Sequence, residues 1–385
     1  MKARAILINT ALVLGSLALG LVAGEGAARV ALNPADYLSV ELRDDPILGA
    51  KPFAGTAGGA FDAWGFRNSS VPSSAPIVAI GDSHTYGNTA TMAQAWPAVL
   101  ARVSGRSVYN MGLGGYGPNQ YAHLLSQALT LSPELVVVGL YMGDDFENAF
   151  RITYGLDHWK SLRALPADKV VDFDIWGTRP TPWAWHKHMR VWLSRHSVLY
   201  QLVFHGPLLG RMKGETQIRQ AAGHSGDVTA LDLPDQAILE AFRPKGLRVN
   251  LDQDSPGVNE GMRITFELLA QMKQRCAAKN VGFMVAVIPT KEMVFADLLE
   301  QRPELPLADT IAPLLAHERR ARDATFARLR QADIAFVDVL PALRKARGEQ
   351  IYARTANDMH PNGNGYRVIG ETIAGALASR GAPRP

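Results

Sequence analysis

The sequence predicts an α/β protein in which a parallel β-sheet carries helices on both faces. From residue 77 onward, short apolar runs alternate with longer segments of helical period, as in a chain of βα units. The runs at 77–80, 135–141 and 281–288 are almost entirely apolar, as expected for strands buried on both sides. Polar and glycine residues follow these runs, so functional side chains are expected at the carboxyl edge of the sheet.

The first element in the chain is an apolar segment. Lys2 and Arg4 precede residues 5–24, which carry no charge and are long enough to cross a bilayer. Basic residues on this side predict a cytoplasmic N-terminus, an inner-membrane anchor and an extracytoplasmic remainder. Helical period continues to residue 32, which favours a retained anchor over residues 1–32. Cleavage after Val22-Ala23-Gly24, giving a secreted protein, is the alternative.

Residues 33–76 are expected to form a lead-in segment, because 51–76 is rich in Gly, Pro, Ser and Ala. Residues 77–385 then form the main domain. Further helices are predicted at 96–103, 119–131, 262–278, 312–331 and 365–378, and further strands at 107–110 and 335–339.

The βα rhythm breaks over residues 151–257, which we interpret as a lobe inserted over the functional edge of the sheet. Five of the seven tryptophans lie there: Trp159, Trp176, Trp183, Trp185 and Trp192. Aromatic rings can stack on sugars, so the lobe is a candidate polymer-binding region. The alternative is that most of these rings build the lobe's own core.

Composition limits the classes of function. The chain has 385 residues, 47% of them hydrophobic and 20% charged, which is typical of a folded protein. The net charge of +4 is spread along the chain and indicates no nucleic-acid partner. Cys276 is the only cysteine, so neither an intrachain disulfide nor a thiolate metal cluster can form. The sequence offers no set of ligands that predicts a metal site.

Two distant polar segments suggest nucleophilic catalysis. Ser83 follows the strand 77–80 directly after Gly81 and Asp82. Asp358-Met359-His360 lies in a polar turn ahead of the last helix. A serine at a strand end together with an Asp/His pair can form a hydroxyl nucleophile and its base.

Four short blocks resemble those of the SGNH, or GDSL-type, hydrolase family, and they occur in the family's order. They are residues 81–87 (GDSHTYG), 110–115 (NMGLGG), 143–145 (GDD) and 358–360 (DMH). Residues 64–68 (WGFRN) also resemble a segment ahead of the first block in membrane-anchored bacterial relatives. The resemblance covers the chain from residue 62 to its end. It implies a three-layer αβα sandwich of flavodoxin type that needs no cofactor.

The resemblance also implies roles for individual residues. Ser83 would be the nucleophile, His360 the base and Asp358 the acid that orients the base. The backbone N–H groups of Ser83 and Gly115 would bind the oxyanion. In the family the acid commonly stands three residues before the histidine, where this chain has Asn357, so Asp358 departs from the commonest spacing.

The third block departs from the family pattern as well. Relatives use an asparagine amide as a third oxyanion donor, and here the position is Asp144. An ionised carboxylate would repel an oxyanion. Asp144 is therefore expected to be protonated and to donate a hydrogen bond, or to turn away; the alternative is that catalysis has been lost.

Five more residues are candidates for substrate binding: Asp82, His84, Asn119, Lys291 and Asn362. Lys291 follows the strand 281–288, so it either contacts a substrate or pairs with Glu292.

The combined interpretation is a serine-dependent acyl ester hydrolase or acyltransferase that acts on O-acetyl groups of cell-envelope or extracellular polysaccharide. Its expected partners are the acylated carbohydrate, the membrane and proteins of a polysaccharide-modification system. A lipase or thioesterase is one alternative. A catalytically inactive polysaccharide-binding or assembly protein on the same fold is the other.

Overall fold

The computed structural model describes residues 2–53, 60–166, 185–205, 228–355 and 358–379, together with 214–216, 218 and 220. Its centre is a parallel sheet of five strands in the order β4-β3-β5-β8-β9. The strands are β3 (Ile77–Gly81), β4 (Val108–Gly112), β5 (Leu135–Tyr141), β8 (Gly282–Ile288) and β9 (Ala335–Asp338). The predicted α/β fold with a parallel sheet is confirmed.

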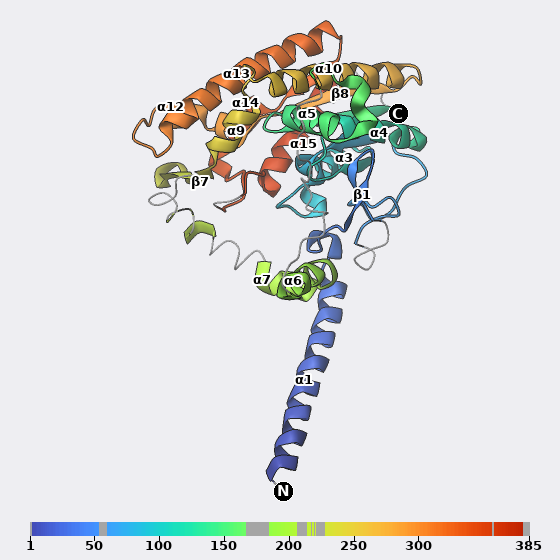
Figure 1. Ribbon diagram of the computed structural model, residues 1–385, viewed down its shortest axis with the longest axis vertical. Coiled ribbons are helices and arrows are strands. Elements are labelled where there is room, and N and C mark those ends of the chain that lie inside the picture. Colours follow the sequence, from blue (N-terminus) through green and yellow to red (C-terminus); the bar gives the residue numbers. More distant parts are fainter. Residues whose placement is uncertain are drawn as a thin grey trace.

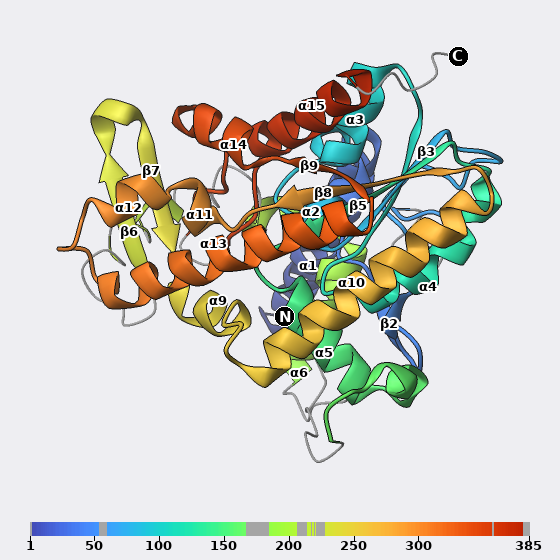
Figure 2. The ribbon, with the colours of Figure 1, turned by 90° about the horizontal axis from the view of Figure 1, so that it is seen from above.

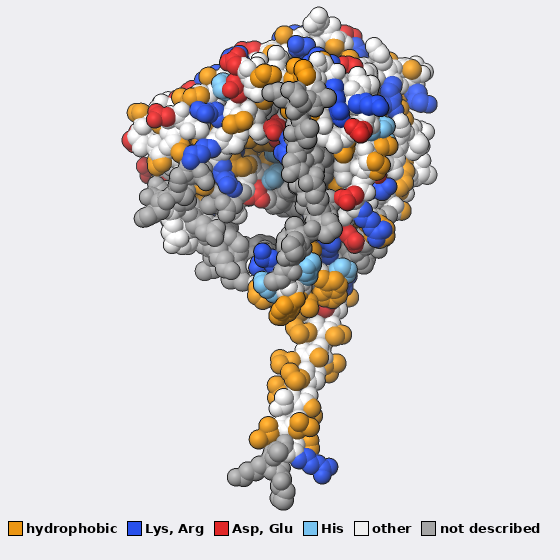
Figure 3. All heavy atoms as spheres, viewed as in Figure 1, with side chains coloured by type: hydrophobic (Ala, Val, Ile, Leu, Met, Phe, Trp, Pro, Cys, Tyr) orange, Lys and Arg blue, Asp and Glu red, His pale blue; other side chains and the backbone are white. Residues whose placement is uncertain are grey.

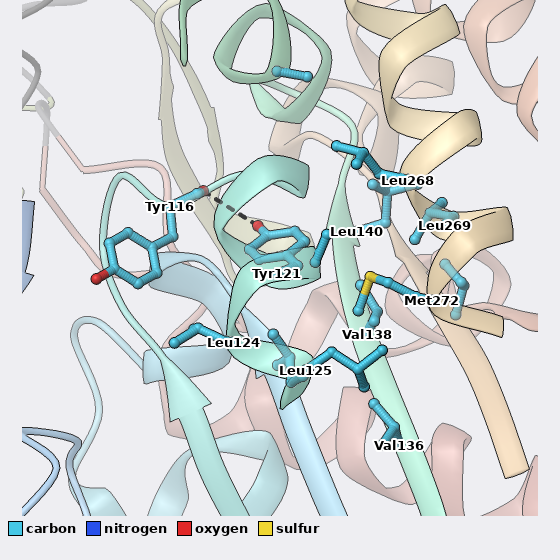
Figure 4. Close-up of a cluster of buried hydrophobic side chains, with 14 of the residues drawn as sticks. Tyr116, Tyr121, Leu124, Leu125, Val136, Val138, Leu140, Leu268, Leu269 and Met272 are labelled. Carbon is cyan, nitrogen blue, oxygen red and sulfur yellow. Dashed lines mark hydrogen bonds between the residues drawn. The ribbon is translucent and has the colours of Figure 1, made fainter. Parts of the chain in front are cut away.

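Helices cover both faces of this sheet (Figure 2). On β5, Val136, Val138 and Leu140 point to the face covered by α4 (Pro118–Ala128) and α10 (Pro256–Ala277), as Figure 4 shows. Alternate side chains of the sheet point to the other face, which α3 (Trp96–Ser104) and α15 (Gly363–Ser379) cover. Full burial of one such aliphatic side chain typically contributes about 1.5–3 kcal/mol, so the two layers of core stabilise the sheet.

The remaining elements surround this sandwich. The helices are α1 (Lys2–Ala31), α2 (Ser83–Tyr86), α5 (Asp145–Gly155), α6 (Trp185–His196), α7 (Val198–His205), α9 (Pro244–Asn250), α11 (Lys291–Val294), α12 (Ala296–Glu300), α13 (Ala308–Gln331) and α14 (Leu340–Ala346). Two antiparallel hairpins pair β1 (Leu42–Asp45) with β2 (Gly49–Pro52) and β6 (Thr229–Leu233) with β7 (Ile238–Phe242). Short 3-10 helices are η1 (Pro34–Asp36), η3 (Met92–Gln94), η4 (Leu129–Leu131), η5 (Asp157–Leu162), η6 (Pro234–Gln236) and η7 (Arg347–Glu349).

One helix begins well before its predicted start. The expected helix at 262–278 is α10, which starts six residues earlier, at Pro256. Ser255 precedes it with an extended backbone, and proline suits the first helical position because the N–H it lacks would have no partner there. Ser255 and Pro256 are therefore typical of a helix start, but the prediction was based on the apolar period, which begins only at residue 262.

The N-terminal helix α1 projects away from the sandwich (Figure 1). Its span Arg4–Ala31 is long and apolar enough to cross a membrane, and the apolar stretch is not buried by the rest of the structure. At its inner end Ala28 packs in a small cluster with Val198 of α7 and Leu38. Only this end of α1 is therefore held by the folded body.

The tryptophans of the expected lobe have different environments. Trp159 packs on the main core, and its Nε1–H donates a hydrogen bond to the carbonyl of Ile47 at 2.8 Å. Trp185 and Trp192 are exposed on α6. Trp176 and Trp183 lie outside the described residues. Trp159 thus belongs to the sandwich rather than to a separate core of the lobe.

Candidate active site

Ser83 lies at the junction between β3 and the short helix α2. Asp82 caps this helix, because its carboxylate accepts a hydrogen bond from the backbone N–H of His84 at 2.9 Å. Gly81 allows a close approach: a Cβ at this position would lie 2.1 Å from a side-chain oxygen of α2. The turn brings Ser83 to the carboxyl edge of the parallel sheet, the edge at which α/β proteins place ligands.

Ser83, His360 and Asp358 form a continuous chain of hydrogen-bond contacts. Nε2 of His360 lies 2.8 Å from Oγ of Ser83, and its Nδ1 lies 2.6 Å from Oδ1 of Asp358. The same carboxylate oxygen accepts the backbone N–H of His360 at 2.9 Å. Burial lowers the pKa of His360, but the hydrogen bond and charge of Asp358 outweigh it and raise this pKa above its ordinary value. The three groups have the geometry of a nucleophile, a base and a carboxylate that orients the base.

Asn362 holds the backbone that carries His360. Its amide donates hydrogen bonds to the carbonyls of Gln350, at 2.5 Å, and Tyr352, at 2.9 Å. Its side-chain oxygen accepts two backbone N–H groups at the start of α15. All these contacts are within the protein, so Asn362 has a clear structural role next to the site.

The turn after β4 lies against the serine. A Cβ on Gly114 would be 3.7 Å from Cβ of Ser83, and Gly115 adopts φ +79°, which favours glycine. Leu113 donates its N–H to the carbonyl of Gly81 at 3.1 Å and so fixes the turn to the end of β3. The turn that carries Gly114 and Gly115 is therefore packed against Ser83 at Gly114.

Asp144 follows β5 and has an unusual electrostatic environment. Carboxylate oxygens of Asp82, Asp144 and Asp145 lie within 4.8 Å of one another. Among the described residues, no group forms a hydrogen bond with the buried Oδ1 of Asp144. Burial, followed by the charge of Asp82, raises the pKa of Asp144 to about 8. The raised pKa favours the neutral form of Asp144, and a neutral carboxyl group can donate a hydrogen bond.

The neighbouring Asp145 differs from Asp144 because its partners are within the fold. The hydroxyl of Tyr121 donates to one carboxylate oxygen at 2.8 Å, and the N–H of Tyr141 donates to the other at 2.9 Å. Burial and the charges of Asp82 and Asp144 raise its pKa well above the ordinary value. Asp145 therefore supports the end of β5 rather than facing a substrate.

Asp82 and His84, both predicted to bind substrate, lie in the protein interior next to Ser83 and His360. They are buried, and Nδ1 of His84 lies 3.1 Å from Oδ2 of Asp82. The His84 ring stacks on Tyr141 at 3.8 Å and lies 4.8 Å from the ring of His360, measured between centroids. Burial lowers the pKa of His84 despite the charge of Asp82. The His84 ring, held by Asp82, therefore packs against the ring of His360 from the protein interior.

Two other predicted substrate contacts have their polar partners within the fold. Asn119 is fully buried, and its amide donates to the hydroxyl of Thr153 on α5 at 3.0 Å. Lys291 is also buried and forms an ion pair with Glu240 of β7. The expected alternative for Lys291, a pair with Glu292, is wrong because the β6-β7 hairpin, distant in sequence, brings Glu240 to the lysine.

The Lys291–Glu240 pair yields a stability prediction. Lys291→Met is expected to reduce the free energy of unfolding by about 3–5 kcal/mol, because it leaves the carboxylate of Glu240 buried without its partner. Lys291→Met combined with Glu240→Leu is expected to recover most of this loss. Denaturant unfolding of the detergent-solubilised chain measures both variants. Unchanged stability of Lys291→Met together with a raised KM would instead indicate a substrate contact.

Asp144 and His360 together predict the pH profile of ester turnover. Activity should rise with pH as His360 loses its proton, through a pKa above the ordinary histidine value. It should fall above about pH 8, where Asp144 ionises and repels the oxyanion. Asp144→Asn keeps a neutral donor at every pH, so the upper limb should disappear while activity at pH 7 stays the same or increases.

A rate–pH series for kcat/KM tests this prediction. Glu147→Gln removes another nearby carboxyl whose pKa burial raises, and it should keep the upper limb, moved to lower pH because the charge of Glu147 helps to raise the pKa of Asp144. If Asp144→Asn abolishes turnover in a folded protein, the carboxylate has a role other than oxyanion donor.

Arg67 links residues 35–36 of the lead-in segment to the loop 87–90, which follows α2, through hydrogen bonds and an ion pair. The sequence alone did not predict this role. It is buried, pairs with Asp36 at 2.8 Å and donates to the carbonyls of Ala35, Gly87 and Ala90 at 2.9–3.0 Å. The WGFRN resemblance drew attention to this segment. The partners of Arg67 could not be identified, because their pairing depends on the tertiary fold.

Comparison with known proteins finds one matching family and several similar solved structures. Residues 250–384 match the family described as the SGNH hydrolase-like domain of the acetyltransferase AlgX. This range contains Asp358 and His360, whereas Ser83 lies before it. No curated protein matches the chain.

Three solved structures are similar at low identity. Phospholipase A1 from Streptomyces albidoflavus has 11% identity and a TM-score of 0.40, covering 80% of this chain and 99% of that one. A lipolytic protein of the G-D-S-L family from Desulfitobacterium hafniense has 13% identity and a TM-score of 0.39, covering 78% and 98%. An extracellular lipase from Streptomyces rimosus has 13% identity and a TM-score of 0.37, covering 79% and 98%.

Proposed function

This chain carries an SGNH hydrolase-like domain, and we propose that it is a serine-dependent esterase or O-acyltransferase for O-acetyl groups of cell-envelope or extracellular polysaccharide. The observation that carries the proposal is the chain of contacts from Ser83 through His360 to Asp358. The description of the matched family as an acetyltransferase supports acetyl as the acyl group.

In the proposed reaction, Oγ of Ser83 attacks the carbonyl carbon of the ester and transfers its proton to Nε2 of His360. The backbone N–H groups of Ser83 and Gly115, with protonated Asp144, stabilise the oxyanion. The intermediate collapses, the C–O bond to the leaving alcohol breaks, and the alcohol takes the proton from His360. Asp358 orients the imidazole and stabilises its charged form throughout.

The resulting acyl-enzyme can react in two ways. Attack by water, with His360 as the base, releases the carboxylic acid, whereas attack by a sugar hydroxyl transfers the acyl group. Both outcomes use the same residues. The proposal therefore covers hydrolysis and transfer as alternative second steps of one mechanism.

The proposal also includes the location of the reaction. We infer that α1 is retained in the inner membrane and that the sandwich lies outside the cytoplasm. Lys2 and Arg4 ahead of the apolar span support this orientation. Intact-mass measurement of the membrane-extracted protein tests retention, and a mature N-terminus near Glu25 would contradict it.

The purified chain, incubated with an acetylated polysaccharide, tests the activity. Release of acetate identifies an esterase, and acetyl groups on an added acceptor oligosaccharide identify a transferase. A parallel series of p-nitrophenyl esters, from acetyl to long acyl chains, tests the lipase alternative. Preference for long chains would contradict the acetyl assignment, and no turnover of any ester would favour the binding-protein alternative.

A further inference from the structure

Two helices beside α1 expose apolar side chains that the described residues leave uncovered. On α6 the exposed fractions are 77% for Trp185, 48% for Met189 and 55% for Trp192. These three positions have the i, i+4, i+7 spacing that places them on one face of a helix. On α7 the exposed side chains are Leu202, Val203 and Phe204. We call α6 and α7 together the α6–α7 platform.

Side-chain contacts attach the platform to α1. The carboxylate of Glu25 accepts hydrogen bonds from Ser197 Oγ, at 2.8 Å, and from the backbone N–H groups of Val198 and Leu199, at 3.0 Å each. It therefore caps α7 from another helix. Arg29 donates to Glu25 at 2.7 Å and to the carbonyl of His196 at 2.7 Å.

The position of Glu25 in α1 determines how deep the platform would lie in a bilayer that α1 crosses. Residues 5–24 carry no charge, and 20 helical residues rise about 30 Å, which matches the thickness of the hydrocarbon core. Glu25 follows this stretch directly, so the platform lies where α1 would leave the membrane. Figures 1 and 3 show α6 and α7 at this end of α1, with hydrophobic side chains gathered around it.

The composition of the platform fits the headgroup region of a bilayer. Tryptophan is typical of membrane–water interfaces, and basic residues next to it favour anionic lipids. Residues 185–205 contain Lys187, Arg190 and Arg195 and no Asp or Glu. A face that docks a protein could lie anywhere on the domain, whereas a face that contacts lipid has to lie next to the membrane-spanning helix. Continuity with α1 therefore favours lipid as the occupant.

We propose that the α6–α7 platform lies in the bilayer interface, with its apolar face inserted between headgroups. This inference rests on the proposed retention of α1. Its consequence is a fixed orientation of the catalytic domain. The chain leaves α1 into η1, where Asp36 pairs with Arg67, and Arg67 contacts the loop after Ser83. The membrane tether is thus linked through direct contacts to the segment that follows the nucleophile.

An environment-sensitive dye on the platform tests the proposal. Met189→Cys, labelled with a nitrobenzoxadiazole maleimide, reports on α6. Ala316→Cys is the control, because Ala316 is exposed and belongs to α13, a helix on the side of the molecule away from α1 (Figure 1). The unmodified chain is the labelling blank, since Cys276 is fully buried. Each chain is reconstituted into vesicles of phosphatidylcholine and phosphatidylglycerol, and flotation establishes that it is bound.

In the bound chain, the dye at position 189 is expected to shift its emission to the blue and to be quenched by doxyl-labelled lipid, unlike the dye at 316. The same result is expected with Ser83→Ala, because the readout does not depend on catalysis. Emission at 189 that matches emission at 316 would overturn the proposal while leaving the enzyme assignment intact. A blue shift without lipid quenching would also overturn it, since protein rather than lipid would then cover α6.

Discussion

Replacing Ser83 by alanine is expected to reduce kcat for ester turnover by about a million-fold, as serine-enzyme precedents suggest. The substitution removes the Oγ atom that lies 2.8 Å from Nε2 of His360, so no acyl-enzyme can form. The backbone N–H groups near the serine remain, and they can support only a small residual rate. Initial rates with p-nitrophenyl acetate measure the loss.

Ser73→Ala is the matched control, because Ser73 is an exposed serine shortly before the same strand. It should retain full activity. Comparable activity of Ser83→Ala and the unmodified chain would show that the hydroxyl of Ser83 is not the nucleophile.

Asp358→Ala is expected to lower kcat by about ten-thousand-fold, the size of effect known for the orienting acid of a serine triad. Its Oδ1 contacts both Nδ1 and the backbone N–H of His360, so the substitution releases the ring and removes the charge that stabilises imidazolium. KM should change much less, since the acid acts through His360 rather than on the substrate.

Asn357→Ala tests the competing family spacing and should retain most activity, because an amide cannot supply the negative charge. Asn357 lies outside the described residues, so this expectation comes from the chemistry of its side chain. Equal losses for the two variants would mean that another residue supplies the acid. Asp338 is poorly suited, because its carboxylate binds Arg322 at 2.7 Å and the N–H of Leu340 at 3.0 Å.

The centre of the sheet could be predicted from the sequence because β3, β5 and β8 are continuous apolar runs. The run at 135–141 is β5 to the residue, since a short apolar run rich in β-branched residues and bounded by turn residues is typical of a strand buried on both faces. The start of α10 was missed because capping residues give a weaker signal than apolar period. The environments of Trp159 and Trp185 could not be predicted, because Trp159 packs on a distant loop whereas Trp185 stays largely exposed on α6.

The candidate site was predictable where a residue follows a strand or belongs to a short motif. Ser83, Asp358 and His360 belong to such motifs, and the fold brings them together. Asn119 and Lys291 also follow strands or turns, but their partners, Thr153 and Glu240, come from segments that only tertiary packing brings near. The position of a residue after a strand therefore predicted that it lies near the carboxyl edge of the sheet. It did not predict whether its side chain points toward the site or into the core.

Covalent labelling with a fluorophosphonate probe tests most directly whether Ser83 is an activated nucleophile. The probe forms a stable adduct only with a serine whose proton a neighbouring base removes. We predict one adduct per chain, located at Ser83 by peptide mass spectrometry, and none in Ser83→Ala. We also predict slow labelling of Asp358→Ala, because His360 loses its orienting contact. Absence of labelling in the folded, unmodified chain, or an adduct on another serine, would contradict the assignment.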